Sequence, residues 1–186
     1  MKSGTTFISV IVIVIAAIVY FGLKPSCPEP SGRPATVSVQ RVIDGDTVAL
    51  SNGSRVRLIG IDTPECHYSR KLLRDSRRNG KDIATITKLG SRAREFTKSL
   101  CLGKAVSLEY DVERRDRYGR TLAYLYLDDG RFVNAEIVKA GYAQPMTVPP
   151  NVKHADLFLN LEREARREGR GLWKGPDMDM ASGLDN

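Results

Sequence analysis

The chain has 186 residues, enough for one domain of ordinary size with a tail or two. It carries 29 Lys and Arg against 22 Asp and Glu, a formal net charge of +7, and this excess suggests a polyanionic partner without identifying one. The three cysteines form no CxxC pair and no Cys/His cluster at zinc spacing. Their odd number also argues against a disulfide framework.

The amino-terminal part of the chain differs in composition from the rest. Residues 7–23, FISVIVIVIAAIVYFGL, carry no charge and approach the shortest length that spans a bilayer. Lys24 and Pro25 follow where a signal peptide would have a small-residue cleavage site, and the absence of a polar face argues against a buried core helix. We therefore expect a membrane anchor in residues 1–24, with a cleaved signal peptide as the alternative. Positive charges flank both ends, so they decide little about orientation.

The remainder of the chain divides by composition into three parts. Residues 25–35 are rich in proline and read as a linker. Residues 36–174 show the periodic apolar patterns of a folded domain, and residues 175–186 are expected to form a disordered tail.

The folded part predicts five strands and three helices. Residues 36–61 read as a three-stranded meander, turned by Asp44-Gly45 and by Asn52-Gly53. A long polar stretch covers residues 66–87. We expect two further strands at 104–111 and 121–127, and helices at 88–102, 133–141 and 154–168. Five short strands are typical of a small Greek-key barrel, so the predicted class is mainly β with α.

Three segments place charged groups at strand ends or in the adjoining turns: VIDGDTV at 42–48, RLIGIDTPE at 57–65 and DRYGR at 116–120. If the sheet curls, Asp46 and Asp62 can meet. With a backbone carbonyl they would make an oxygen-only site, which suits a hard cation such as Ca²⁺ or Mg²⁺.

The same segments supply arginines and a spare carboxylate. Arg57 and Arg120 offer guanidinium forks that match phosphate oxygens, and Glu65 could take a proton from an attacking water. Each segment alone could be an ordinary turn, helix cap or loop. Together they contain the groups needed to hydrolyse a phosphodiester.

These motifs resemble the thermonuclease, or staphylococcal nuclease, family. IDGDTV, RLIGIDTPE and DRYGR, with the following TLAYLYLDDGRFVNAEIVKAGYA, carry a resemblance that runs from about Val39 to Trp173. It implies a five-stranded oligonucleotide/oligosaccharide-binding (OB) barrel with three helices. It also implies a Ca²⁺-dependent nuclease that cuts DNA and RNA to 3′-phosphate products.

The resemblance also implies roles for single residues. Asp46 and Asp62 correspond to calcium carboxylates, and Thr63 to a position that offers a backbone carbonyl. Arg57 and Arg120 correspond to phosphate-binding arginines, and Glu65 to the proposed general base. Tyr118 and Arg117 correspond to residues beside the nucleotide. Asp44 lies near the metal without being an expected ligand.

Two stretches depart from the family pattern. Residues 144–151, QPMTVPPN, contain no aromatic residue where the family's best-known member has tyrosines that help to hold the nucleotide. Residues 66–87 are longer than usual and strongly basic, and they read either as a solvated flexible loop or as a clamp on a nucleic-acid backbone. The arginines assigned to that clamp are Arg70, Arg74, Arg77 and Arg78.

The predicted function is therefore a metal-dependent nuclease acting on single-stranded or fraying DNA and RNA with little sequence preference. We expect a monomer whose nuclease domain lies outside the cytoplasm, since free calcium is scarce inside cells. Secretion after cleavage is the alternative. A non-catalytic, membrane-anchored nucleic-acid-binding module is the competing function, and the presence of all five charged site residues favours the enzyme.

Overall fold

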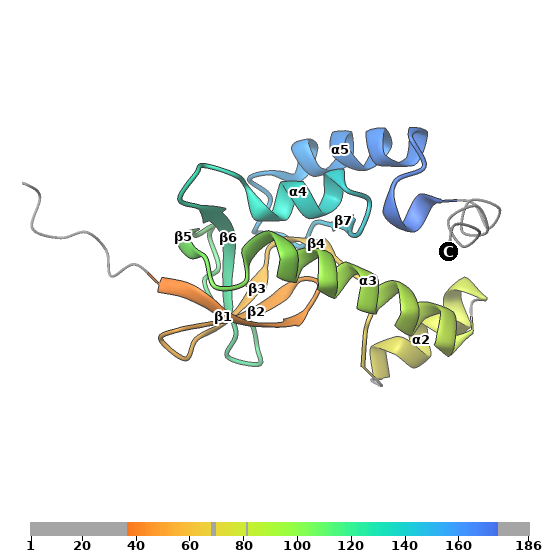
Figure 1. Ribbon diagram of the computed structural model, residues 1–186, viewed down its shortest axis with the longest axis horizontal. Coiled ribbons are helices and arrows are strands. Elements are labelled where there is room, and N and C mark those ends of the chain that lie inside the picture. The colour runs from red at the N-terminus through yellow and green to blue at the C-terminus, as the bar shows by residue number, and fades with distance from the viewer. Residues whose placement is uncertain (1–36, 68–69, 81, 175–186) are drawn as a thin grey trace, which may run out of the picture. The chain divides into compact units, whose positions relative to one another are not determined.

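The structure is a computed structural model that describes residues 37–67, 70–80 and 82–174 (Figure 1). The predicted anchor, the linker and the carboxy-terminal tail lie outside these residues. Within the described ranges, no helix is both long and apolar enough to cross a bilayer. The fold described below is that of residues 37–174.

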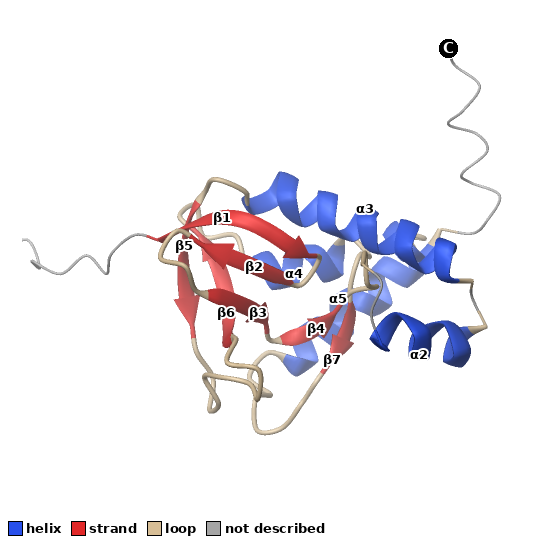
Figure 2. Ribbon diagram, turned by 90° about the horizontal axis from the view of Figure 1, so that it is seen from below, coloured by secondary structure: helices blue, strands red, loops and turns tan. Residues whose placement is uncertain are grey.

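Five strands close into a barrel, as the sequence predicts (Figures 1 and 2). They follow one another around the barrel in the order β1, β2, β3, β6 and β5. All the pairings are antiparallel except that of β3 with β6, which is parallel and sets Val56 opposite Thr121. The bounds are β1 (Val37–Asp44), β2 (Thr47–Leu50), β3 (Arg55–Leu58), β5 (Ala105–Glu109) and β6 (Thr121–Leu127).

The predicted third strand is not continuous. It ends at Leu58, and the chain resumes as β4 (Gly60–Asp62), which pairs with β7 (Gln144–Met146) rather than with β2. Gly60 makes this break possible, because its φ is +79° and a Cβ atom there would lie 2.5 Å from the Phe158 ring. The predicted meander therefore ends at Leu58 and does not continue through residue 61.

Three helices correspond to the predicted ones: α3 (Ile83–Cys101), α4 (Val133–Lys139) and α5 (Ala155–Arg167). A short 3₁₀ helix, η1 (Gly171–Trp173), follows α5. Helix α3 begins earlier than expected because Asp82 caps it, accepting a hydrogen bond from the Thr85 backbone N–H at 2.7 Å.

A further helix, α2 (Arg70–Asn79), lies within the basic stretch that the sequence predicts as either a flexible loop or a clamp on a nucleic-acid backbone. It lies beside α3 in both views (Figures 1 and 2), and its Leu72 side chain is buried. Part of this basic stretch is therefore a helix with an apolar contact to the rest of the domain.

The core fills the barrel and continues beneath the helices. Val39, Val48 and Val56 are buried inside it, and Ile137 of α4 and Phe158 of α5 close one side. Helix α3 packs on β1, and α4 packs on β6. Cys101 is fully buried and free, as expected of a core thiol, and the Leu172 N–H donates to the Gly141 carbonyl, so the chain after α5 packs back on the domain.

Candidate active site

The turn that carries Asp46 is held by helix α3. The Thr97 hydroxyl, fully buried, donates to the Gly45 carbonyl at 2.7 Å, and Arg94 Nε donates to the Val42 carbonyl at 3.2 Å. A Cβ atom on Gly45 would lie 2.8 Å from the Thr63 side chain, so the turn also packs directly against Thr63. Buried hydrogen bonds of this kind fix the backbone on which Asp46 stands.

Asp46 connects strand β2 with the segment after β4. Its side chain is only 3% exposed. Oδ2 accepts hydrogen bonds from the Thr63 backbone N–H at 3.0 Å and from the Thr63 hydroxyl at 3.1 Å, while Oδ1 accepts from the Thr47 hydroxyl at 3.0 Å. These hydrogen bonds hold the Asp46 carboxylate in place against the segment after β4.

Arg57 lies between Asp46 and Asp62. Its Nη1 forms an ion pair with Asp46 Oδ1, and its Nη2 lies 2.8 Å from Asp62 Oδ1 and 3.3 Å from the Ile61 carbonyl. Burial lowers the pKa of Arg57, and the neighbouring Asp62 carboxylate opposes that shift. The two carboxylates that the sequence set at separate strand ends thus face one guanidinium group.

Glu65 is positioned by the close approach of α3. A Cβ atom on Gly90 would lie 2.4 Å from the Glu65 carbonyl oxygen and 2.7 Å from the Cys66 nitrogen, so only glycine allows this contact. The Glu65 side chain is half-buried, and its charge acts on both Arg57 and Asp44. Glu65 therefore belongs to the same cluster as the two aspartates.

Asp44 and Cys66 form a neighbouring pair at the edge of this cluster. Burial raises the pKa of Asp44, a hydrogen bond with Cys66 opposes the shift, and the negative charge of Glu65 adds to it. Burial and the Asp44 carboxylate together raise the pKa of Cys66 to about 12, so the thiol stays protonated at neutral pH. Its Sγ lies 3.8 Å from the Ile43 carbonyl.

The DRYGR loop is folded around Asp116. Asp116 Oδ2 accepts from Arg120 Nε at 2.6 Å, and Oδ1 accepts from the backbone N–H groups of Tyr118 and Arg120 at 2.9 Å each. Burial would raise the pKa of Asp116, but these hydrogen bonds outweigh burial and hold the pKa below its usual value. Asp116 is a supporting residue that the sequence motifs did not predict. An aspartate that precedes a Tyr-Gly turn signals such a side-chain cap.

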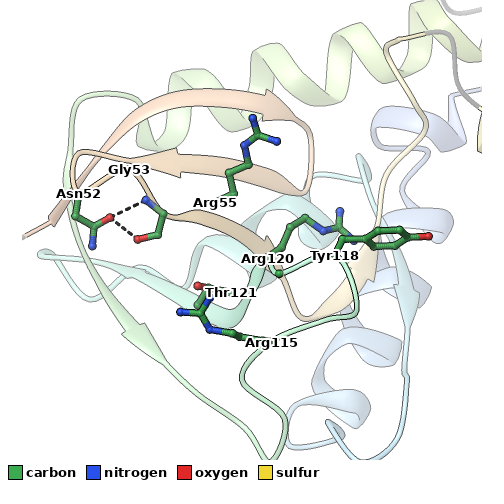
Figure 3. A pocket seen from close by; sticks show the side chains of 9 residues that line it. Asn52, Gly53, Arg55, Arg115, Tyr118, Arg120 and Thr121 are labelled. Atoms are coloured by element: carbon green, nitrogen blue, oxygen red, sulfur yellow. Dashed lines mark hydrogen bonds between the residues drawn. The ribbon is translucent and has the colours of Figure 1, made fainter.

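Tyr118 stands at the outer side of this loop. Its side chain is exposed, and the guanidinium carbons of Arg117 and Arg120 lie 4.9 Å and 5.6 Å from the ring centroid. Figure 3 shows Tyr118 beside Arg120. An exposed ring with two neighbouring guanidinium groups is a surface on which a planar or anionic ligand can stack.

The four arginines assigned to the clamp all lie on helix α2. Arg74 and Arg77 are exposed on α2, and Arg70 and Arg78 belong to the same helix. Residues 144–151, which contain no aromatic side chain, begin with strand β7. Gln144 of β7 pairs with Asp62 of β4, so this segment supports the backbone of the site. Sequence reasoning missed this strand.

The acidic cluster fits a hard cation in its donor chemistry. The Asp46 and Asp62 carboxylates offer oxygen atoms only, and both are close enough to share one positively charged group. Among the described residues, no three His, Cys, Asp or Glu side chains together form a metal-binding group. The candidate site therefore has two carboxylates, and further ligands would come from backbone, solvent or substrate.

The closed five-stranded barrel with helices packed on it defines this protein as an OB fold. Residues 55–175 match the family described as Staphylococcal nuclease homologue. The chain belongs to the staphylococcal nuclease family. The matched region includes Arg57, Asp62, Glu65 and Arg120 and begins after Asp46.

Curated relatives extend this similarity over most of the chain. The chain is 34% identical to the thermonuclease of Staphylococcus intermedius over 181 residues. The matched stretch covers 94% of this chain and 99% of that protein. It is 31% identical over 184 residues to the thermonuclease of Staphylococcus hyicus, covering 93% of this chain and 99% of the relative. It is also 34% identical over 142 residues to endonuclease YncB of Bacillus subtilis, covering 74% of this chain and 61% of that protein.

Proposed function

We propose that this protein is a nuclease that hydrolyses phosphodiester bonds of DNA and RNA with little sequence preference. One observation carries the proposal above all. Arg57 bridges Asp46 and Asp62, and the charges of Arg120 and Glu65 both act on its pKa. Hydrolysis of a phosphodiester needs positive groups and a general base positioned around one phosphate, and this cluster brings such groups together. Membership of the staphylococcal nuclease family supports the same reaction.

Each side chain has a distinct role in the proposed reaction. Arg57 and Arg120 hold the phosphate oxygens and stabilise the negative charge that builds up on them. Glu65 takes a proton from water as the water oxygen bonds to phosphorus. The bond from phosphorus to the 5′ oxygen breaks, and that oxygen takes a proton from solvent. The products are a 3′-phosphate and a 5′-hydroxyl.

Asp46 and Asp62, with the Thr63 carbonyl, would hold Ca²⁺ in this proposal. The cation would supply positive charge at the phosphate. Arg57 now balances both carboxylates, so a bound cation would leave its guanidinium group available to the substrate. Thr97 and Gly90 act as positioning residues, since they fix the backbone of Asp46 and Glu65 through α3.

The test is digestion of single-stranded DNA and RNA by the full-length chain in calcium, in magnesium and in chelator, with analysis of the product ends. Calcium-dependent cleavage that leaves 3′-phosphates is the expected result. A folded protein that binds the DNA but cuts it under none of these conditions would support the non-catalytic binding module instead.

Two further features complete the proposal. Helix α2 would lie along the backbone of a long substrate, because exposed arginines at Arg74 and Arg77 sit one helical turn apart. The apolar residues 7–23 would anchor the chain in a membrane with the nuclease domain outside the cytoplasm. Cell fractionation with protease protection tests the latter: the protein should enter the membrane fraction, and protease added outside should digest the domain.

A further inference from the structure

A polar pocket of about 690 Å³ opens beside the proposed active site (Figure 3). The β2–β3 hairpin forms one wall, and the DRYGR loop with the start of β6 forms the other. The residues that line it are Asn52, Gly53, Ser54, Arg55, Arg115, Tyr118, Gly119, Arg120 and Thr121.

The pocket shares residues with the catalytic cluster and extends beyond it. Tyr118 and Arg120 belong to both, whereas Arg55 and Arg115 lie only in the pocket. Arg55 is two residues before Arg57 on β3, so both side chains point out of the barrel. Side chains at this spacing along a strand are about 6.6 Å apart, comparable to the distance between consecutive phosphates of an extended single strand.

The pairing of β3 with β6 brings the second arginine to the same place. Val56 pairs with Thr121, and Thr121 in turn forms an antiparallel bridge with Arg115. Arg115 therefore lies on the segment bridged to β6, and β6 in turn pairs with β3. Figure 3 shows the side chains of Arg55, Arg115 and Arg120 leaving in different directions, with their guanidinium groups at separate points.

The charges of the pocket are unbalanced. Arg55 and Arg115 are exposed, and within the described ranges neither side chain forms an ion pair. Arg120 is the one lining arginine with an acidic partner, Asp116, and no carboxylate lines the pocket. Three positive groups without a lining carboxylate favour the binding of a polyanion that carries several negative charges in a row.

We propose that this pocket binds the nucleic-acid backbone next to the cleaved bond, with Arg55 and Arg115 contacting phosphates beyond the one held by Arg57 and Arg120. The inference rests on the proposed nuclease function and adds a substrate-length preference to it. A chain that continues past the cleaved bond on this side would gain two charge-assisted contacts. A substrate with a single phosphate would gain neither.

The test compares the full-length Arg55→Gln/Arg115→Gln variant with wild type. One substrate is a nucleoside nitrophenyl phosphodiester with a single phosphate, and the other is a twelve-residue oligothymidylate. The matched control is Arg163→Gln/Arg167→Gln, which removes two exposed charges from α5 outside the pocket. We expect kcat/KM of the pocket variant to fall at least about tenfold more on the oligonucleotide than on the small diester. The control should match wild type on both.

Binding of the oligonucleotide under chelation gives a second measurement that needs no cleavage. The slope of log Kd against log salt should fall by roughly 1.4 in the pocket variant, because each lost phosphate contact on a single strand contributes about 0.7. Equal losses of kcat/KM on both substrates, or an unchanged salt slope, would overturn the pocket assignment while leaving the nuclease intact. A wild-type protein that binds but does not cut would instead count against the nuclease, and the salt slope would still decide the pocket.

Discussion

Asp46 and Asp62 face the same guanidinium group, that of Arg57, although they stand at the ends of strands that do not pair with each other. The Asp46 side chain is almost fully buried and that of Arg57 is 13% exposed, so their charges depend on each other for compensation. Any change at Arg57 therefore affects both stability and the capacity of the two carboxylates to share a cation.

Replacing Arg57 should destabilise the protein most when calcium is absent. Arg57→Gln removes the guanidinium group that both carboxylates face, and breaking a buried pair in this way costs roughly 3–5 kcal/mol. Bound calcium should recover part of that loss. Urea denaturation in chelator and in calcium measures both effects, with Arg55→Gln on the same strand as the control. An equal loss in the two buffers would argue against a cation between these carboxylates.

Glu65→Gln should separate binding from cleavage. The amide keeps the size of the side chain but cannot accept a proton, so kcat should fall by about 10²–10⁴-fold while the affinity for single-stranded DNA changes little. Glu113→Gln, an exposed glutamate on the β5–β6 connection, is the control. Unchanged cleavage by Glu65→Gln would show that another group removes the proton from water.

Gly90→Ala should harm both stability and activity, although alanine is the better helix former. The added methyl group would press on the Glu65–Cys66 backbone, and overpacking of this kind costs about 1–3 kcal/mol. Thermal unfolding and kcat on DNA should both decrease. Ser91→Ala, one position along on the exposed side of α3, should be neutral or slightly stabilising. If Gly90→Ala behaved like Ser91→Ala, α3 would not position Glu65.

A fourth prediction concerns pH and a site away from the active-site cluster. Glu109 forms an ion pair with Lys153, accepts a hydrogen bond from the Tyr126 hydroxyl at 2.7 Å and lies 3.4 Å from His154 Nε2. The contact with Lys153 is the largest cause that holds the pKa of Glu109 below its ordinary value of 4.5. These contacts tie β5 and β6 to the start of α5.

The sign of the effect follows from the lowered pKa. The stabilisation is fully present above the unfolded pKa and is lost as the pH falls through the folded value. Glu109→Gln should cost about 1 kcal/mol at pH 7, a modest figure because the site is partly exposed. The difference from wild type should shrink as the pH falls below about 4.5. Urea denaturation across that range checks it, and a constant difference would mean that packing, not charge, is lost.

Helix α2 gives a prediction for long substrates. Arg74→Gln/Arg77→Gln should weaken polymer binding and flatten its salt dependence, while affecting a dinucleotide much less. The α5 variant Arg163→Gln/Arg167→Gln again serves as the control. Equal losses on the polymer and on the dinucleotide would place these arginines outside the substrate path.

Much of the fold could be predicted from local patterns. The alternating strands and the Asn52-Gly53 turn indicate the meander, and the five-strand barrel is confirmed. The break at Gly60 was not predicted, because the apolar run of residues 58–61 reads as the continuation of one strand. The positive φ of Gly60 and its contact with Phe158 are visible only in the structure. Helix α2 was missed because its sequence is dominated by charge, and the burial of Leu72 is visible only in the structure.

The candidate site also has a part that could be predicted from the sequence and a part that could not. Charged residues at strand ends predicted which groups meet, and the structure brings Asp46, Arg57 and Asp62 together. The supporting groups were invisible locally, because Thr97 and Gly90 act on residues far away in the chain. Tertiary contacts alone identify them. The sequence also gave no reason to expect Gln144 beside Asp62, since β7 has only three residues.

The parallel pairing of β3 with β6 has a consequence for the life of the chain before it is folded. Arg57 and Arg120 are brought together only after Val56 has paired with Thr121, a contact between distant parts of the sequence that forms slowly. An incompletely folded chain has both arginines but no site. Catalytic competence should thus emerge with barrel closure, so a newly made chain would be harmless to the nucleic acids around it until folding is complete.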